Sequence, residues 1–104
     1  AIGVQSTSSG HLSTAFGTKT KASGAYSTAL GVGASSEGEG SIALGGAASS
    51  KGKTSIAIGT KVKTVGESAT SMGYGAEASS KGAVAIGLDS RAGDGNAATG
   101  TAGC

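Results

Sequence analysis

The chain has 104 residues, of which 21 are glycine and none is proline, and its aromatic residues are two tyrosines and one phenylalanine. Such side chains cannot fill a globular core. Ordering one residue costs roughly 1.5 kcal/mol of free energy, whereas burial of apolar surface contributes only roughly 25 cal/mol for each Å². We therefore expect one domain that gains stability from self-association. The net charge of +2, with interleaved signs, is too small to indicate a polyanion partner such as a nucleic acid. No apolar run is long enough to span a membrane as a helix.

Two series of glycines recur every fourteen residues along the chain. A fixed short period is typical of a solenoid, in which each repeat is one coil that stacks on its neighbours. We count positions within a coil from each glycine of the first series, which is position 0. The first series comprises Gly3, Gly17, Gly31, Gly45, Gly59, Gly73 and Gly87, and the second comprises Gly10, Gly24, Gly38, Gly52 and Gly66.

The residues before each first-series glycine predict a short strand. The run from Ser41 to Gly45 and its counterparts in the other coils alternate small and large residues with a period of two. One face of this strand holds serine, alanine and glycine. The other face holds large apolar residues and their partners, namely Phe16, Leu30, Ile42, Leu44, Ile56, Ile58, Met72, Val84 and Ile86.

The residues after each first-series glycine predict a second strand with a different pattern. Positions one, three and five hold small or apolar residues, for example Val32, Ala34 and Ser36. Positions two, four, six and eight hold every charged residue of the chain except Asp94. This segregation indicates a strand with one dry face and one wet face.

Two short strands and two glycine turns per coil predict a flattened roll of two parallel sheets. We expect the small faces to point inward, so that Ala43 and Ala57 meet Ala34 and Ala48 across a thin core. The large apolar residues then form a stripe on the outside, roughly 30 Å long at about 4.8 Å per coil. Stripes of this size are interfaces on soluble proteins. The alternative is that these residues fill the interior of the roll.

Charged residues alternate in sign between successive coils at two positions. Equivalent positions lie side by side in a parallel solenoid, so this alternation predicts neighbouring opposite charges that help to set the register. The alternative is a solvated face without ordered signs. Position eight holds Glu39, Lys53, Glu67 and Lys81, and position four holds Lys63, Glu77 and Arg91.

No catalytic constellation is visible, and we predict neither an enzyme nor a cofactor. His11 is the single histidine and lies at a wet position, and Cys104 is the single cysteine, so a zinc site lacks ligands. An ice-binding solenoid needs a regular array of threonines, and Thr18 and Thr60 do not recur in every coil.

The end of the chain departs from the repeat. Asp94 stands where a second-series glycine belongs, and Thr101 stands where the next first-series glycine belongs. We therefore predict that the roll covers residues 1–92 and that residues 93–104 form an irregular tail.

The motif Ser-Ile-Ala-Leu/Ile-Gly, repeated every fourteen residues and followed by Ala-x-Ala/Ser-x-Gly, resembles the YadA-like head domain of trimeric autotransporter adhesins over residues 1–92. The resemblance implies an all-β fold, a left-handed parallel β-roll that assembles as a homotrimer. It also implies autotransporter secretion, display on the outer membrane of a Gram-negative bacterium through an anchor outside this chain, and binding to host matrix proteins such as collagen, fibronectin or laminin.

One departure from the family argues against collagen as the ligand. The collagen-binding member has the repeat Asn-Ser-Val-Ala-Ile-Gly-x-x-Ser, and this chain has Leu12, Tyr26, Gly40 and Thr54 in place of the asparagine. If the apolar stripe packs in the trimer, the wet face of the second strand remains for adhesion. That candidate face comprises Lys19, Lys21, Glu37, Lys51, Lys61, Lys63 and Glu77. The alternative function is a structural spacer or fibre segment without a ligand of its own.

Overall fold

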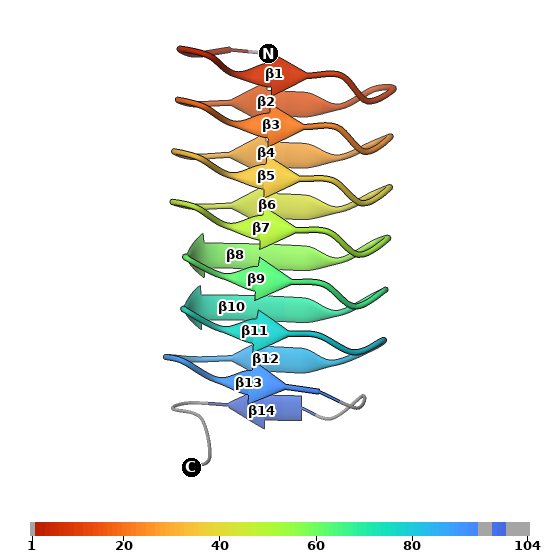
Figure 1. Cartoon of the computed structure of the whole chain (residues 1–104), viewed down its shortest axis with the longest axis vertical. Coiled ribbons are helices and arrows are strands. Elements are labelled where there is room, and N and C mark those ends of the chain that lie inside the picture. Colours follow the sequence, from red (N-terminus) through yellow and green to blue (C-terminus); the bar gives the residue numbers. More distant parts are fainter. Residues whose placement is uncertain (1, 94–96, 100–104) are drawn as a thin grey trace.

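The computed structural model describes residues 2–93 and 97–99. The described chain winds into a flat roll with overall dimensions of 39 × 20 × 10 Å. Each coil contributes one short strand to a near sheet and one to a far sheet (Figure 1). The near strands run to the right and the far strands to the left as the chain descends, so the roll is left-handed (Figure 1).

The two sheets have seven parallel strands each, and no helix occurs in the described residues. We call them the odd sheet and the even sheet after their strand numbers. The odd sheet comprises β1 (Thr7–Ser8), β3 (Lys21–Ala22), β5 (Ser35–Ser36), β7 (Ser49–Ser50), β9 (Lys63–Thr64), β11 (Glu77–Ala78) and β13 (Arg91–Ala92). The even sheet comprises β2 (Thr14–Phe16), β4 (Thr28–Leu30), β6 (Ile42–Leu44), β8 (Ile56–Thr60), β10 (Thr70–Tyr74), β12 (Val84–Ile86) and β14 (Ala97–Thr99).

The register of both sheets follows the fourteen-residue period. Ala29 pairs with Ala43 between β4 and β6, and Ser35 pairs with Ser49 between β5 and β7. Equivalent positions of successive coils therefore lie side by side. The predicted all-β parallel solenoid with a 14-residue repeat is confirmed.

The core between the sheets consists of methyl and hydroxyl groups. Ala43, Ala57, Ala34 and Ala48 are all fully buried, and the largest fully buried side chain is Val62. The large residues that precede the first-series glycines lie outside this core; Phe16, for example, is 52% exposed. The small faces point inward as predicted, and the alternative with the large residues inside is wrong.

Pairs of serine hydroxyls meet in the core, one from a strand of the odd sheet and one from the residue before the following strand of the even sheet. Ser36 and Ser41 lie 2.6 Å apart between their Oγ atoms, and Ser41 donates a hydrogen bond of 2.7 Å to the carbonyl oxygen of Gly38. The Oγ of Ser27 is buried and has no hydrogen-bond partner. Ala22 stands at the position that Ser36 occupies in the next coil, so Ser27 lacks the hydroxyl partner that Ser41 has.

The glycines permit the coils to stack closely. A Cβ atom on Gly45 would lie 2.1 Å from the carbonyl oxygen of Gly59, and the φ angle of Gly45 is +118°. Gly52 belongs to the second series and has no positive φ, yet its Cβ would lie 2.1 Å from the carbonyl oxygen of Gly66. The fourteen-residue spacing of glycine thus reflects contact between backbones of adjacent coils.

Position one differs from the prediction, because its side chains point outward. Val32 is 63% exposed, and Tyr74 and Leu88 are also exposed. The strands β8 and β10 run on through the first-series glycine, and Thr60 pairs with Tyr74 beyond it. Because side chains alternate along a strand, position one lies on the same outer face as the large residues that precede the glycine.

The predicted irregular tail is wrong for residues 97–99, which form β14 and pair in parallel with β12. The reason is a coil that is one residue shorter. Val84 pairs with Ala97, thirteen residues further on, and Ile86 pairs with Thr99. A prediction that assumes fourteen residues in every coil therefore misplaces this last strand by one residue. The remaining tail positions, 94–96 and 100–104, lie outside the described residues.

Candidate adhesive and assembly surfaces

The outer face of the even sheet is apolar, and we call it the apolar face. All nine large residues that the sequence singled out lie on it, and each is half-buried or exposed in the isolated roll. No strand of this sheet contains a charged residue. The nine residues are Phe16, Leu30, Ile42, Leu44, Ile56, Ile58, Met72, Val84 and Ile86.

The side chains at position one widen the apolar face, and sequence reasoning missed them. Val4, Val32, Tyr74 and Leu88 are exposed there. The signal was present in the sequence, since the period-two alternation of the first strand continues across the glycine into position one. The prediction treated the glycine as the end of that strand.

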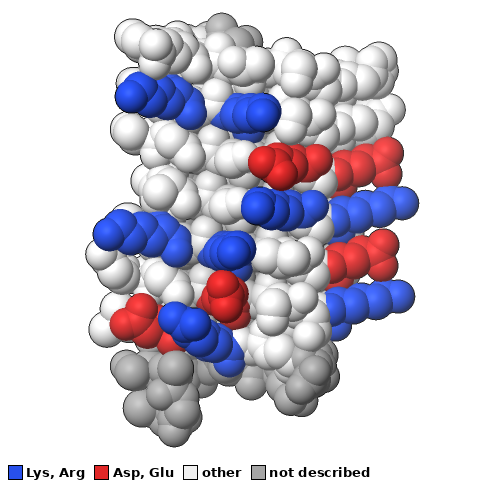
Figure 2. Space-filling view, in the orientation of Figure 1, with Lys and Arg blue, Asp and Glu red and all other residues white. Residues whose placement is uncertain are grey.

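The outer face of the odd sheet carries the charges, and we call it the charged face. Figure 2 views the molecule from this side and shows lysine, arginine, aspartate and glutamate spread along its length. All seven predicted residues of the candidate adhesive face lie here or at its border, and all except the half-buried Glu77 are exposed. They are Lys19, Lys21, Glu37, Lys51, Lys61, Lys63 and Glu77.

The alternating charges form ion pairs between adjacent coils. The Nη1 of Arg91 lies 3.9 Å from the Oε1 of Glu77 at position four. At position eight, Lys53 pairs with Glu39 at 3.5 Å, and Lys81 pairs with a glutamate of the coil before it at 3.6 Å. The predicted neighbouring opposite charges are therefore confirmed at three places, and their exposure makes them aids to register rather than large stabilising terms.

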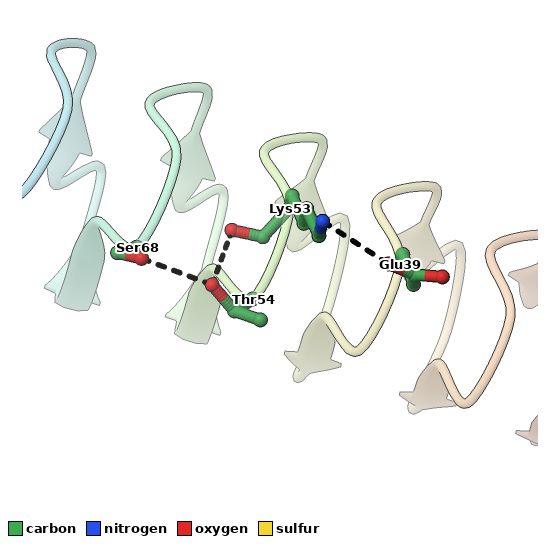
Figure 3. Close-up of polar contacts among 4 residues, drawn as sticks. All are labelled: Glu39, Lys53, Thr54 and Ser68. Carbon is green, nitrogen blue, oxygen red and sulfur yellow. Dashed lines mark hydrogen bonds and ion pairs between the residues drawn. The ribbon is translucent and has the colours of Figure 1, made fainter.

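One edge of the roll is connected from coil to coil through side chains at positions eight and nine. Lys53 reaches back to Glu39, while the Oγ1 of Thr54 lies 3.0 Å from the Oγ of Ser68 in the following coil (Figure 3). The ion pair between Glu67 and Lys81 then continues the series. These contacts link four successive coils, so this edge is held by its own residues.

The opposite edge brings a basic residue against an aromatic ring. The Nζ of Lys61 lies 5.8 Å from the ring centroid of Tyr74, within the range of a cation–π contact. Lys61 belongs to the charged face and Tyr74 to the apolar face, so the contact marks the border between them. On the edge of positions eight and nine, the exposed His11 packs edge-on against the ring of Tyr26, with 5.8 Å between the ring centroids.

Three kinds of feature were not found in the described part of the chain. Among them, no three histidine, cysteine, aspartate or glutamate side chains are grouped to hold a metal ion. That part of the chain also has no pocket, and it contains no helix of the length and apolarity needed to cross a bilayer.

The repeat pattern and the roll together decide the family. The family described as YadA head domain repeat (2 copies) matches residues 8–34, 36–61 and 65–90. The chain belongs to the YadA head family. Each match spans about two coils of the roll, in agreement with the two repeat copies of the description. YadA heads are adhesin-type structural domains and are not a known enzyme family. A comparison with curated proteins found no match.

Proposed function

We propose that this chain is the head segment of a trimeric autotransporter adhesin that attaches a bacterium to host cells or extracellular matrix. The observation that carries the proposal is the separation of two surfaces. One side of the roll presents only apolar and small uncharged residues in its strands, and the other side presents the charges. A YadA head needs one surface for assembly and one for contact with the host.

The apolar face supports assembly into a homotrimer. Leu44 and Ile58 lie at its centre in the half-buried state, and Phe16 and Met72 are exposed. Each such side chain contributes roughly 1.5–3 kcal/mol when it becomes fully buried. An alanine core supplies little of this energy within one chain, and threefold symmetry repeats every contact.

The charged face supports adhesion because it remains accessible along the whole roll when the apolar faces pack together. Three copies around an axis present the same residues three times. Individually weak contacts then gain from high effective concentration on one matrix fibre. The proposed location is the outer membrane of a Gram-negative bacterium, reached by the autotransporter route and held by an anchor outside this chain.

Assembly is tested by adding charge to each surface in turn. The double variant Leu44→Asp, Ile58→Asp should give unfolded or aggregated chains, because six carboxylates would have to be buried near the axis. The matched control is Ser35→Asp, Ser49→Asp, which adds the same charge to the charged face and should remain a trimer. The measurement is sedimentation together with circular dichroism. A well-folded monomer from the Leu44, Ile58 variant would refute the proposed role of the apolar face.

Adhesion is tested by attachment of the trimer to a panel of matrix proteins and to host cells. Reversing the charge of Lys19, Lys21, Lys61 and Lys63 together should weaken attachment and leave the trimer folded. Attachment that is unchanged in this variant would move the site away from the charged face. A trimer that attaches to no member of the panel and to no cell would be a structural spacer.

A further inference from the structure

We propose that the charged face binds a linear sulfated polysaccharide that lies parallel to the axis of the roll. The inference rests on the proposed adhesive function and names the class of its ligand. It starts from the lysines that have no ion pair with any described carboxylate, namely Lys19, Lys21, Lys51, Lys61 and Lys63.

Four of these lysines form two pairs along one line of the odd sheet. Lys21 is followed in register by Ser35, then Ser49, then Lys63. Three rungs of about 4.8 Å separate the two lysines, so they lie about 14 Å apart along the axis. Lys19 and Lys61 precede them by two residues in the same two coils. We call this line of residues the lysine track.

The floor of the track between the lysine pairs is formed by small side chains. Ser35 and Ser49 are half-buried, and the turn positions beside them are Gly33 and Ala47. No acidic residue interrupts this line from Lys21 to Lys63. The line between the two lysine pairs therefore holds only small, uncharged side chains.

Two acidic residues lie beside the track, and they are outnumbered by the lysines around it. Glu37 lies two residues beyond Ser35, and its Oε2 accepts a hydrogen bond of 3.2 Å from the Oγ of Ser35, so this carboxylate borders the floor of the track. Glu77 follows Lys63 in register and pairs with Arg91 on its other side. Lys51 lies next to the middle of the track and adds a fifth positive charge. The track therefore keeps a local excess of positive charge although the chain has a net charge of only +2.

The shape of the face favours a glycan over a folded protein. Protein interfaces gain most of their energy from large anchors that enter recesses in the partner. The described surface has no pocket, and the floor of the track has neither a large apolar side chain nor an aromatic ring. A sulfated polysaccharide needs neither, because its sulfates contact ammonium groups and its hydroxyls can hydrogen-bond with serine.

The same features argue against a nucleic acid strand. Proteins that bind single strands stack successive bases on aromatic side chains. Tyr74 is the one described aromatic residue beside the track, and it lies at the border with the apolar face near Lys61. A polymer that carries sulfates along its whole length reaches both lysine pairs at once, whereas a single small anion reaches one.

The experiment uses the full chain as a trimer and immobilised heparin as the probe, with fully desulfated heparin as the reference polymer. Binding to heparin should be measurable at low salt and absent on the desulfated polymer. With four lysine contacts, affinity should fall on the order of 50-fold between about 50 and about 200 mM salt, by analogy with counterion release from nucleic acids. Equal binding to the desulfated polymer, or equal displacement by single-stranded DNA at the same charge concentration, would overturn the inference.

Variants locate the site. Lys21→Ser, Lys63→Ser should lose at least about tenfold in affinity, since two of four charge contacts are removed. Serine already occupies this line at Ser35 and Ser49, so the variant should fold. The matched control Lys53→Ser, Lys81→Ser removes the same charge from the edge of the roll and should bind within about twofold of the parent. Equal losses in the two variants would show that net charge alone governs binding, and no loss in the first would show that the track is not the site.

The Ser35→Asp, Ser49→Asp variant places two carboxylates between the lysine pairs and should abolish heparin binding while the trimer persists. Retained binding would also overturn the inference. The experiments distinguish failure of the sulfated-polysaccharide inference from failure of the proposed adhesive function. A trimer that attaches to matrix proteins or cells but not to heparin refutes only the sulfated polysaccharide, whereas a trimer that attaches to none of them refutes both.

Discussion

The stacking of glycine on glycine between coils is tested by three alanine substitutions that separate two physical costs. Gly82→Ala introduces only conformational strain, because φ is +71° and no atom lies within 4 Å of the new Cβ. Gly52→Ala introduces only a steric clash, because its Cβ would lie 2.1 Å from the carbonyl oxygen of Gly66 and its φ is not positive. Gly45→Ala combines both costs.

The magnitudes follow from the geometry. A residue with Cβ in the left-handed region costs about 1–2 kcal/mol, of which roughly 0.4–1 kcal/mol is recovered from the reduced entropy of the unfolded chain. Gly82→Ala should therefore cost about 1 kcal/mol or less. For Gly52→Ala the coils must separate by about 1.3 Å to bring this contact from 2.1 Å to an ordinary 3.4 Å. Such a separation takes neighbouring hydrogen bonds beyond their range. Two such bonds join these coils, Lys51 N to Thr64 O at 2.8 Å and Ser68 N to Lys53 O at 2.9 Å.

Losing two backbone hydrogen bonds costs about 2 kcal/mol at the middle of the usual range, and Gly45→Ala should lose more still. The assay is urea unfolding followed by circular dichroism at one fixed chain concentration, because the stability of an oligomer depends on concentration. The expected order of stability is the parent chain, then Gly82→Ala, then Gly52→Ala, then Gly45→Ala. A Gly52→Ala variant as stable as Gly82→Ala would refute the idea that backbone contact between coils dictates the glycine period.

Two further predictions concern single side chains. Ser27→Ala should stabilise the fold by about 1 kcal/mol, because it removes a buried hydroxyl without a hydrogen-bond partner. Ser41→Ala is the contrasting variant and should destabilise the fold by a similar amount, since Ser36 would lose its hydrogen-bond partner. Leu12→Asn should raise the free energy of unfolding by about 1 kcal/mol, measured by thermal or urea unfolding. Leu12 has φ of 54°, and asparagine tolerates that conformation better than leucine. Val65→Asn, at an exposed position of the charged face without positive φ, should show no gain, and an equal gain there would indicate a general effect of surface polarity.

Much of the architecture could be predicted from the sequence because a solenoid repeats one local solution. The fourteen-residue spacing of Gly45 and Gly59 indicated the coil, and the alternation of small and large residues indicated which side chains face inward. The alanine core and the outward position of Leu44 and Ile58 follow from that alternation alone. The opposite charges of Glu77 and Arg91 also indicated the register correctly.

The left-handed turn positions could not be read from residue types. Position nine has φ near +60° in every coil from Leu12 to Gly82, although its residues include leucine, tyrosine, threonine and serine. The asparagine of the resembled repeat falls at this position, where its tolerance of the left-handed conformation is useful. Here the path of the stacked coils imposes a conformation that local preference disfavours.

The tertiary structure also decided where the apolar face ends and where the roll continues. Sequence alone determined the period and the two faces of each strand, because both depend on contacts that every coil repeats. It did not determine that position one, such as Val32 or Tyr74, shares the outer face of the even sheet, since that depends on how far strands extend through a glycine. Nor did it determine that Ala97 pairs with Val84 across a coil shortened by one residue. Pairing with the preceding coil sets the register of a strand, and that pairing exists only once the chain has stacked.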